Sequence, residues 1–118
     1  MLASCGSSKP SLKTEFADGI AGVRQTHDYE ALRARLRETL KDVRATPDGE
    51  ARRLAIAGFE ATLRGVQARI DFVENDSGNV AAATRDSRRA DLGLGAGARL
   101  LRAAGRLLEV RVGRLNGY

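Results

Sequence analysis

The sequence has few of the residues that build metal centres, disulfide frameworks or aromatic-rich β-sheets. It contains one cysteine, one histidine, two prolines and no tryptophan among 118 residues. A single cysteine excludes an internal disulfide, and with His27 as the only histidine the chain cannot supply a multi-histidine or cysteine-based zinc site. No run of 18 apolar residues occurs, so no segment is a candidate transmembrane helix. We expect no metal, no cofactor and no enzymatic activity, since no set of catalytic residues is recognisable.

Arginine, by contrast, is abundant and unevenly distributed. It provides 17 of the 20 basic residues, and the formal net charge is +5. Residues 79–118 carry 8 basic and 3 acidic side chains, whereas residues 1–78 carry 12 of each. Because guanidinium groups bind planar carboxylate and phosphate groups well, the C-terminal third is the candidate region for an anionic partner.

The spacing of apolar residues predicts an all-α fold for residues 11–118. Intervals of three and four recur over the segments 11–45, 49–74 and 80–114, and no convincing strand is present. Turns of four or five residues join these segments, which favours an up-down-up antiparallel bundle of three long helices. Ser11 is expected to cap the first. The apolar register slips between Val23 and Tyr29, where Thr26 or Asp28 could cap a restart, so segment 11–45 is either one bent helix or two.

The segment 49–74 has the most regular apolar pattern of the chain. As a helix it would be roughly 40 Å long, and such a rod needs a partner of similar length. That partner is another helix of the bundle, another protein or a second copy of the chain. The residues of this seam are Ile56, Phe59, Leu63, Val66, Ile70 and Val73.

The segment 80–114 combines a weak helix former with a regular leucine row. Leu92–Gly97 contains three glycines, which predicts a kink or a frayed helix start. The alternative is that Gly93 and Gly97, four residues apart, permit close contact with another helix. Leucines then follow every seven residues, at positions 94, 101, 108 and 115.

A row of arginines lies on a different face of this segment from the leucines. On a helical wheel Arg99, Arg102 and Arg106 cluster together, so they are either an ordinary solvated face or a binding surface. Two anionic partners are compatible with such a row. One is anionic lipid, at about 1 kcal/mol per arginine close to the surface, and the other is nucleic acid phosphate.

The most specific motif lies at the start of the sequence. Leu2-Ala3-Ser4-Cys5, followed by Gly6-Ser7-Ser8, resembles the lipobox of bacterial lipoproteins. The resemblance covers about seven residues. It implies that Leu2, Ala3 and Ser4 are the recognition residues, that the Cys5 thiol carries a diacylglyceryl group, and that residues 6–10 act as a flexible tether. In the family a basic start and an apolar stretch of about 7–15 residues precede this motif. Only Met1 does so here, so the resemblance implies a signal region upstream of the printed sequence; the alternative is a free cysteine on a flexible segment.

These observations lead to two functional hypotheses. The first is a small bacterial lipoprotein domain, anchored in the cell membrane through Cys5 and facing the periplasm or the exterior, with a non-enzymatic interaction or structural role. Two or three acyl chains would give stable anchoring where one would not. The second is a cytosolic basic helical protein that binds nucleic acid through its C-terminal third.

Overall fold

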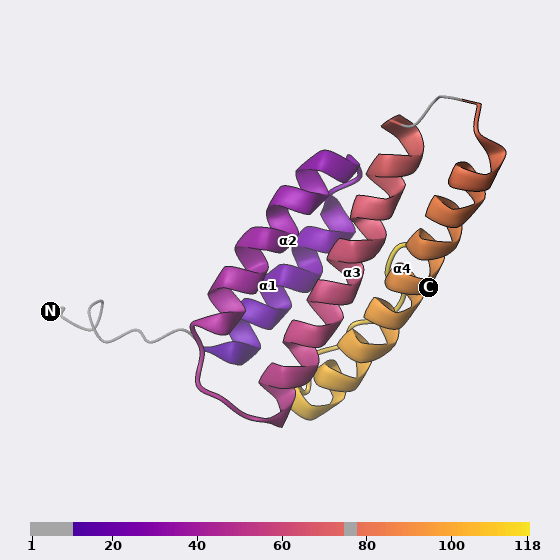
Figure 1. The fold of residues 1–118 in the computed structure, drawn as a ribbon. Helices are drawn as coiled ribbons and strands as arrows, with labels where there is room; N and C mark the ends of the chain where they lie inside the picture. Colours follow the sequence, from indigo (N-terminus) through magenta and orange to yellow (C-terminus); the bar gives the residue numbers. More distant parts are fainter. Residues whose placement is uncertain (1–10, 75–77) are drawn as a thin grey trace, which may run out of the picture.

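The computed structural model describes residues 11–74 and 78–118, and in these residues it contains four α-helices (Figure 1). They are α1 (Leu12–Gln25), α2 (Tyr29–Arg44), α3 (Glu50–Glu74) and α4 (Val80–Leu108). Successive helices run in opposite directions along the bundle. The all-α prediction is confirmed. The described residues form four helices rather than three, because segment 11–45 is broken.

The break between α1 and α2 is caused by capping residues. Ser11 caps α1 as predicted, with its hydroxyl accepting a hydrogen bond from the Thr14 N–H. Thr26 is extended and ends α1. Asp28 is extended as well, and its carboxylate accepts a hydrogen bond from the Ala31 N–H at 3.3 Å. An extended residue with a short polar side chain starts a new helix, so Asp28 provides the restart.

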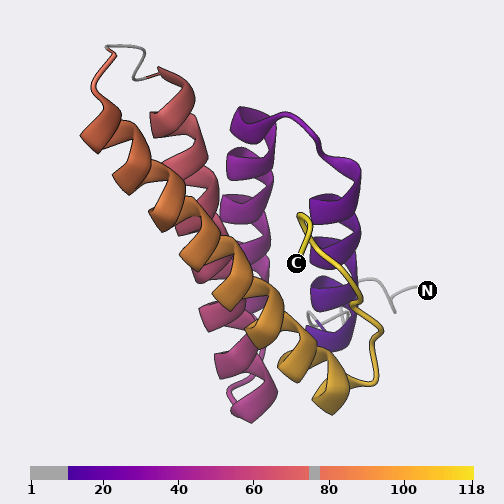
Figure 2. The same cartoon turned by 90° about the vertical axis from the view of Figure 1, so that its right-hand side faces the viewer.

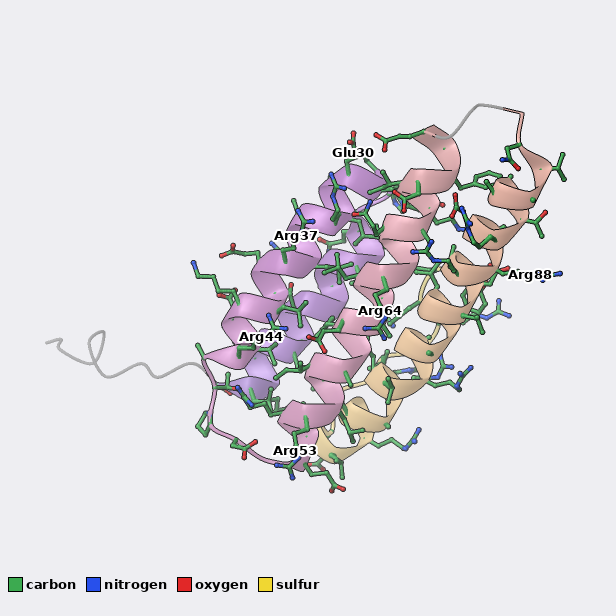
Figure 3. All side chains as sticks on the ribbon, viewed as in Figure 1. Glu30, Arg37, Arg44, Arg53, Arg64 and Arg88 are labelled. Carbon is green, nitrogen blue, oxygen red and sulfur yellow. The ribbon has the colours of Figure 1, made fainter. Side chains whose placement is uncertain are left out.

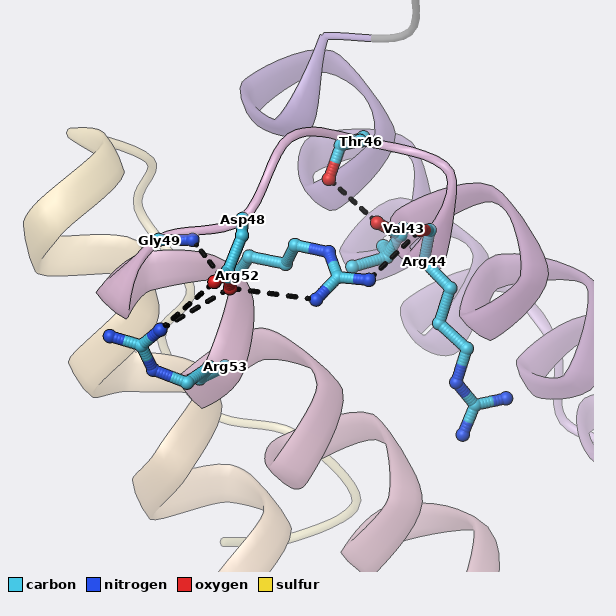
Figure 4. A network of polar contacts seen from close by, with 7 residues as sticks. All are labelled: Val43, Arg44, Thr46, Asp48, Gly49, Arg52 and Arg53. Carbon is cyan, nitrogen blue, oxygen red and sulfur yellow. Dashed lines mark hydrogen bonds and ion pairs between the residues drawn. The ribbon is translucent and has the colours of Figure 1, made fainter.

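The turn between α2 and α3 is held by polar contacts around Asp48 (Figure 4). The Asp48 carboxylate accepts a hydrogen bond from the Gly49 N–H at 2.8 Å and pairs with Arg53 at 3.2 Å. Arg52 reaches back to α2, where its Nη2 donates to the Arg44 carbonyl oxygen at 2.9 Å. The Thr46 hydroxyl donates to the Val43 carbonyl oxygen at 2.6 Å. These contacts fix the direction in which α3 leaves the turn.

The hydrophobic core lies where all four helices meet. Phe16 of α1 and Phe59 of α3 are fully buried, with ring centroids 5.8 Å apart. Leucines of α2 and α4 belong with this pair to one continuous cluster. In the apolar seam of α3, Phe59, Val66 and Ile70 are buried. Ile56 and Leu63 are partly buried against the core, and Val73 at the end of the helix is 65% exposed. Within the bundle α3 therefore finds its partners in α2 and α4.

Glycines allow α3 and α4 to approach closely. A Cβ added to Gly93 would lie 2.6 Å from the backbone nitrogen of Gly65, and one added to Gly97 would lie 2.9 Å from that of Thr62. A Cβ on Gly65 would similarly meet the Leu94 backbone at 2.7 Å. The predicted frayed helix start over Leu92–Gly97 is wrong, because α4 is continuous from Val80 to Leu108. The structure contains the alternative, in which Gly93 and Gly97 permit close contact of α4 with α3.

The C-terminal segment, residues 109–118, folds back along the bundle instead of extending α4. Glu109 adopts left-handed backbone angles, and the Val110 N–H bonds the Gly105 carbonyl oxygen. Residues 109–118 then run between α4 and α1 (Figure 2), where Val112 and Leu115 are buried. The prediction of a helix to Arg114 is therefore wrong, and Leu115 is buried by this reversal rather than as the last leucine of a helical row.

Candidate functional site

The outward side of α4 carries a group of exposed arginines. Seven exposed arginine and leucine residues lie within an arc of about 100° on the helical wheel of α4. We call this surface the basic face. Its members are Arg85, Arg88, Leu92, Arg89, Arg99, Arg106 and Leu107.

The basic face combines cations with exposed apolar side chains. Leu92 is 73% and Leu107 51% exposed, although both are large hydrophobic residues. The two aspartates of α4 lie elsewhere: Asp86 is buried, and Asp91 pairs with Arg69 of α3 at 3.0 Å. The basic face therefore contains no acidic residue. Helices that lie in a lipid–water interface also combine arginine with exposed leucine, although usually on adjoining faces.

The arginines of the basic face differ in their partners. Arg89 and Arg85 lie 3.6 and 4.0 Å from the Asp86 carboxylate, so part of their charge is balanced. Arg88, Arg99 and Arg106 pair with no carboxylate in the described part of the chain. Arg88 extends away from the bundle in Figure 3. These three side chains are available to a partner outside the molecule.

A groove of about 440 Å³ adjoins the basic face between α3 and α4. Its lining includes the small residues Gly93 and Ala96. Arg64 of α3, labelled in Figure 3, lies on one side, and two arginines of α4 lie on the other. The lining includes no acidic side chain, and it consists of Arg64, Gln67, Arg89, Leu92, Gly93, Ala96 and Arg99. The groove is therefore suited to a phosphate or carboxylate group.

The structure separates the three arginines that the sequence placed in one row. Arg99 lines the groove, and Arg106 is exposed on the basic face. Arg102 is half-buried and holds the C-terminal segment instead. Its Nη1 donates to the Tyr118 backbone oxygen at 2.7 Å and to the Gly113 carbonyl oxygen at 3.2 Å. Cys5, the predicted lipidation residue, lies outside the described residues.

Sequence reasoning missed four arginines of this region. Arg85, Arg88 and Arg89 precede the glycine-rich stretch, and a wheel drawn through that stretch would have placed them beside Arg99. The expected kink concealed this relation. Arg64 comes from α3, and only the packing of α3 on α4 brings it near. No signal in the sequence alone indicates that neighbour.

The described residues contain neither a membrane-spanning helix nor a metal-binding cluster. No described helix is both long and apolar enough to span a bilayer. Residues 11–74 and 78–118 contain no group of three or more histidine, cysteine or acidic side chains suited to a metal ion. Comparison with protein-family models, curated proteins and solved structures found no match.

Proposed function

We propose that this chain is a non-enzymatic helical domain of a membrane-anchored bacterial lipoprotein, and that it contacts an anionic membrane surface through the basic face. The observation that carries the proposal is the presence of five arginines and two exposed leucines on one side of α4, without an acidic residue. Arginines close to an anionic bilayer contribute about 1 kcal/mol each, and exposed leucines add apolar burial in the interface.

The position of α1 supports a contribution from an anchor at Cys5. The chain enters the bundle at Ser11, at the same end where α4 finishes (Figure 1). The Phe16 ring of α1 lies 3.7 Å from the position of a Cβ on Gly105 of α4. The six residues from Cys5 to Ser11 span at most about 20 Å. A lipid on Cys5 would therefore hold the Arg106 end of α4 near the bilayer, which raises the effective concentration of the basic face there.

The exposed leucines favour lipid over nucleic acid as the anionic partner. Phosphate contacts to nucleic acid need cations but gain nothing from a leucine that is 73% exposed. In a bilayer interface the same leucine leaves water. Binding of nucleic acid is therefore the competing outcome of the experiment rather than the proposal.

The test uses the full, unlipidated chain in reducing buffer with sedimenting vesicles. We expect binding to vesicles that contain phosphatidylglycerol, weaker binding at high salt, and none to phosphatidylcholine alone. Replacing Arg88, Arg99 and Arg106 by Gln should weaken binding about a hundredfold, from three contributions of about 1 kcal/mol. In the control variant, Lys13, Arg37 and Lys41 are replaced by Gln. This removes the same charge from α1 and α2 and should weaken binding much less.

Two results would overturn the lipid contact. One is equal loss of binding in both triple variants, because net charge alone would then explain the affinity. The other is salt-sensitive binding of duplex DNA without vesicle binding, which would support the nucleic acid alternative. The anchor has a separate test, mass spectrometry of the protein from its native host. A Cys5 thiol that carries no lipid there would remove the membrane anchor from the proposal.

A further inference from the structure

A second hollow lies on another side of the bundle, away from the basic face. It has a volume of about 480 Å³, and its lining comes from α1, α2, the connection between them, α3, α4 and the C-terminal segment. Its lining draws on residues that are up to 93 positions apart in the sequence. They are Val23, Arg24, Thr26, His27, Tyr29, Leu32, Arg69, Leu94, Arg114, Leu115 and Asn116.

The lining of this hollow divides into an apolar part and a cationic part. Val23, Leu32, Leu94 and Leu115 belong to the hydrophobic core and contribute the apolar part. Three arginines contribute the cationic part, and no carboxylate lines the hollow. Such a division is typical of sites that hold a small molecule by an apolar body and one charged group.

The three arginines differ in how far their charge is balanced. Arg69 pairs with Asp91 at 3.0 Å, on the side of α4. Arg24 and Arg114 pair with no carboxylate of the described residues. A Cβ on Gly113 would lie 3.0 Å from Nη2 of Arg24, so the Arg24 guanidinium lies against the residue that precedes Arg114. Two cations without a carboxylate partner at one hollow create a positive electrostatic potential there, which favours the binding of an anion.

We propose that this hollow binds a small organic anion, a carboxylate or phosphate monoester attached to a short apolar body. The charged group would lie by Arg24 and Arg114, and the apolar body would lie on Leu94 and Leu115. Because Arg114 and Leu115 belong to the C-terminal segment, an occupied site also stabilises the folded-back position of that segment. The hollow shares no residue with the basic face, so binding there does not depend on the membrane contact.

The test is an NMR titration of the full chain with four small molecules, chosen so that the contributions of the charged group and of the apolar body can be separated. Octanoate and octyl phosphate carry both the charge and the apolar body, 1-octanol lacks the charge, and inorganic phosphate lacks the body. Octanoate and octyl phosphate are used below their critical micelle concentrations, and 1-octanol is used below its solubility limit. We expect the two anionic amphiphiles to shift the methyl signals of Val23, Leu94 and Leu115, and to bind at least tenfold more tightly than the other two.

Paired variants locate the charged group. Replacing Arg24 and Arg114 by Gln should weaken octanoate binding at least tenfold, while the Arg37→Gln, Arg111→Gln pair, which removes the same charge elsewhere, should leave it unchanged. Both proteins are first shown to be folded by circular dichroism. The proposal is overturned if octanol binds as tightly as octanoate, if the Arg24 and Arg114 variant binds normally, or if the shifted signals belong to residues outside the hollow.

Discussion

At the scale of single residues, Tyr118 reports on the attachment of the C-terminal segment. Its hydroxyl donates a hydrogen bond of 2.6 Å to the Asp91 carboxylate of α4. This bond, with smaller effects of burial and of the Asp91 charge, raises the pKa of Tyr118 above 10.0. A raised pKa in the folded state means that the contact stabilises the fold fully below pH 10.0, and that this stabilisation is lost as the pH rises through the pKa of Tyr118.

The first prediction follows from this contact. In a Tyr29→Phe background Tyr118 is the only tyrosine, so its ionisation can be followed by tyrosinate absorbance. We expect a midpoint above 10.0, and a midpoint closer to 10.0 in the Asp91→Asn variant, which removes the charged acceptor. Equal midpoints in the two proteins would show that the hydrogen bond is not formed in solution.

Asp28 is the residue that divides segment 11–45 into two helices, and its replacement gives the second prediction. Asp28→Ala removes the acceptor of the Ala31 N–H and should lower the free energy of unfolding by about 1 kcal/mol, measured by urea denaturation. Asp28→Asn keeps a side-chain oxygen that caps equally well and should change the stability little. Equal losses in both variants would indicate that charge, rather than capping, is what Asp28 contributes.

At the scale of helices, the close contact of α3 with α4 depends on glycines. Glycine has a low helix propensity, so the sequence of either helix alone gives no reason for these residues. The third prediction compares two glycines of α4. Gly93→Ala brings a methyl group to 2.6 Å from the Gly65 backbone, so the helices must move apart, at a cost of about 1–3 kcal/mol. At Gly95 the same methyl group would lie 3.5 Å from the Tyr118 ring, an ordinary contact.

Gly95→Ala is therefore the matched control for Gly93→Ala. It gains helix propensity without a clash, so the free energy of unfolding should rise by about 0.5–1 kcal/mol. The two substitutions should thus shift the urea midpoint in opposite directions. If both stabilise the protein, α3 and α4 are further apart in solution than the glycine contacts indicate.

The helices were largely predictable from the sequence, and the exceptions have physical causes. Caps and apolar intervals are local signals. They placed Ser11 correctly and left open whether the segment breaks at Thr26 or Asp28 or continues as one bent helix; the structure has the break, with Asp28 as the cap. Gly93 and Gly97 misled the prediction, because their low helix propensity indicates an interrupted helix. In the structure, close packing of α4 on α3 outweighs that low propensity. The end of α4 was missed because the leucine spacing continues to Leu115 after the backbone has reversed at Glu109.

At the scale of the whole molecule, the sequence did not indicate which residues from distant segments lie close together. The up-and-down order of the helices follows from short turns, and the arrangement was predictable to that extent. The basic face was partly predictable because it belongs to one helix. Arg64 beside the groove and the hollow that joins Val23 to Leu115 were not, since both arise only when distant segments pack together.

The C-terminal segment is the feature that connects α4 to α1, and it leads to the last prediction. Val112 and Leu115 are buried there, and Arg24 of α1 lies against Gly113. Leu115→Ala should therefore lower the free energy of unfolding by about 2–5 kcal/mol, as expected for a buried leucine. Leu92→Ala, at a side chain that is 73% exposed, should change it by less than about 0.5 kcal/mol.

Hydrogen exchange adds a spatial readout to the Leu115→Ala variant. Loss of the leucine loosens the C-terminal segment first and then α1, because α1 has the segment as its neighbour on the side of α4. Amides of α1 should therefore exchange faster, while those of α3 beside Gly65 keep the greatest protection. Uniform acceleration over all four helices would show instead that the bundle opens as one unit and that the segment is an inseparable part of its core.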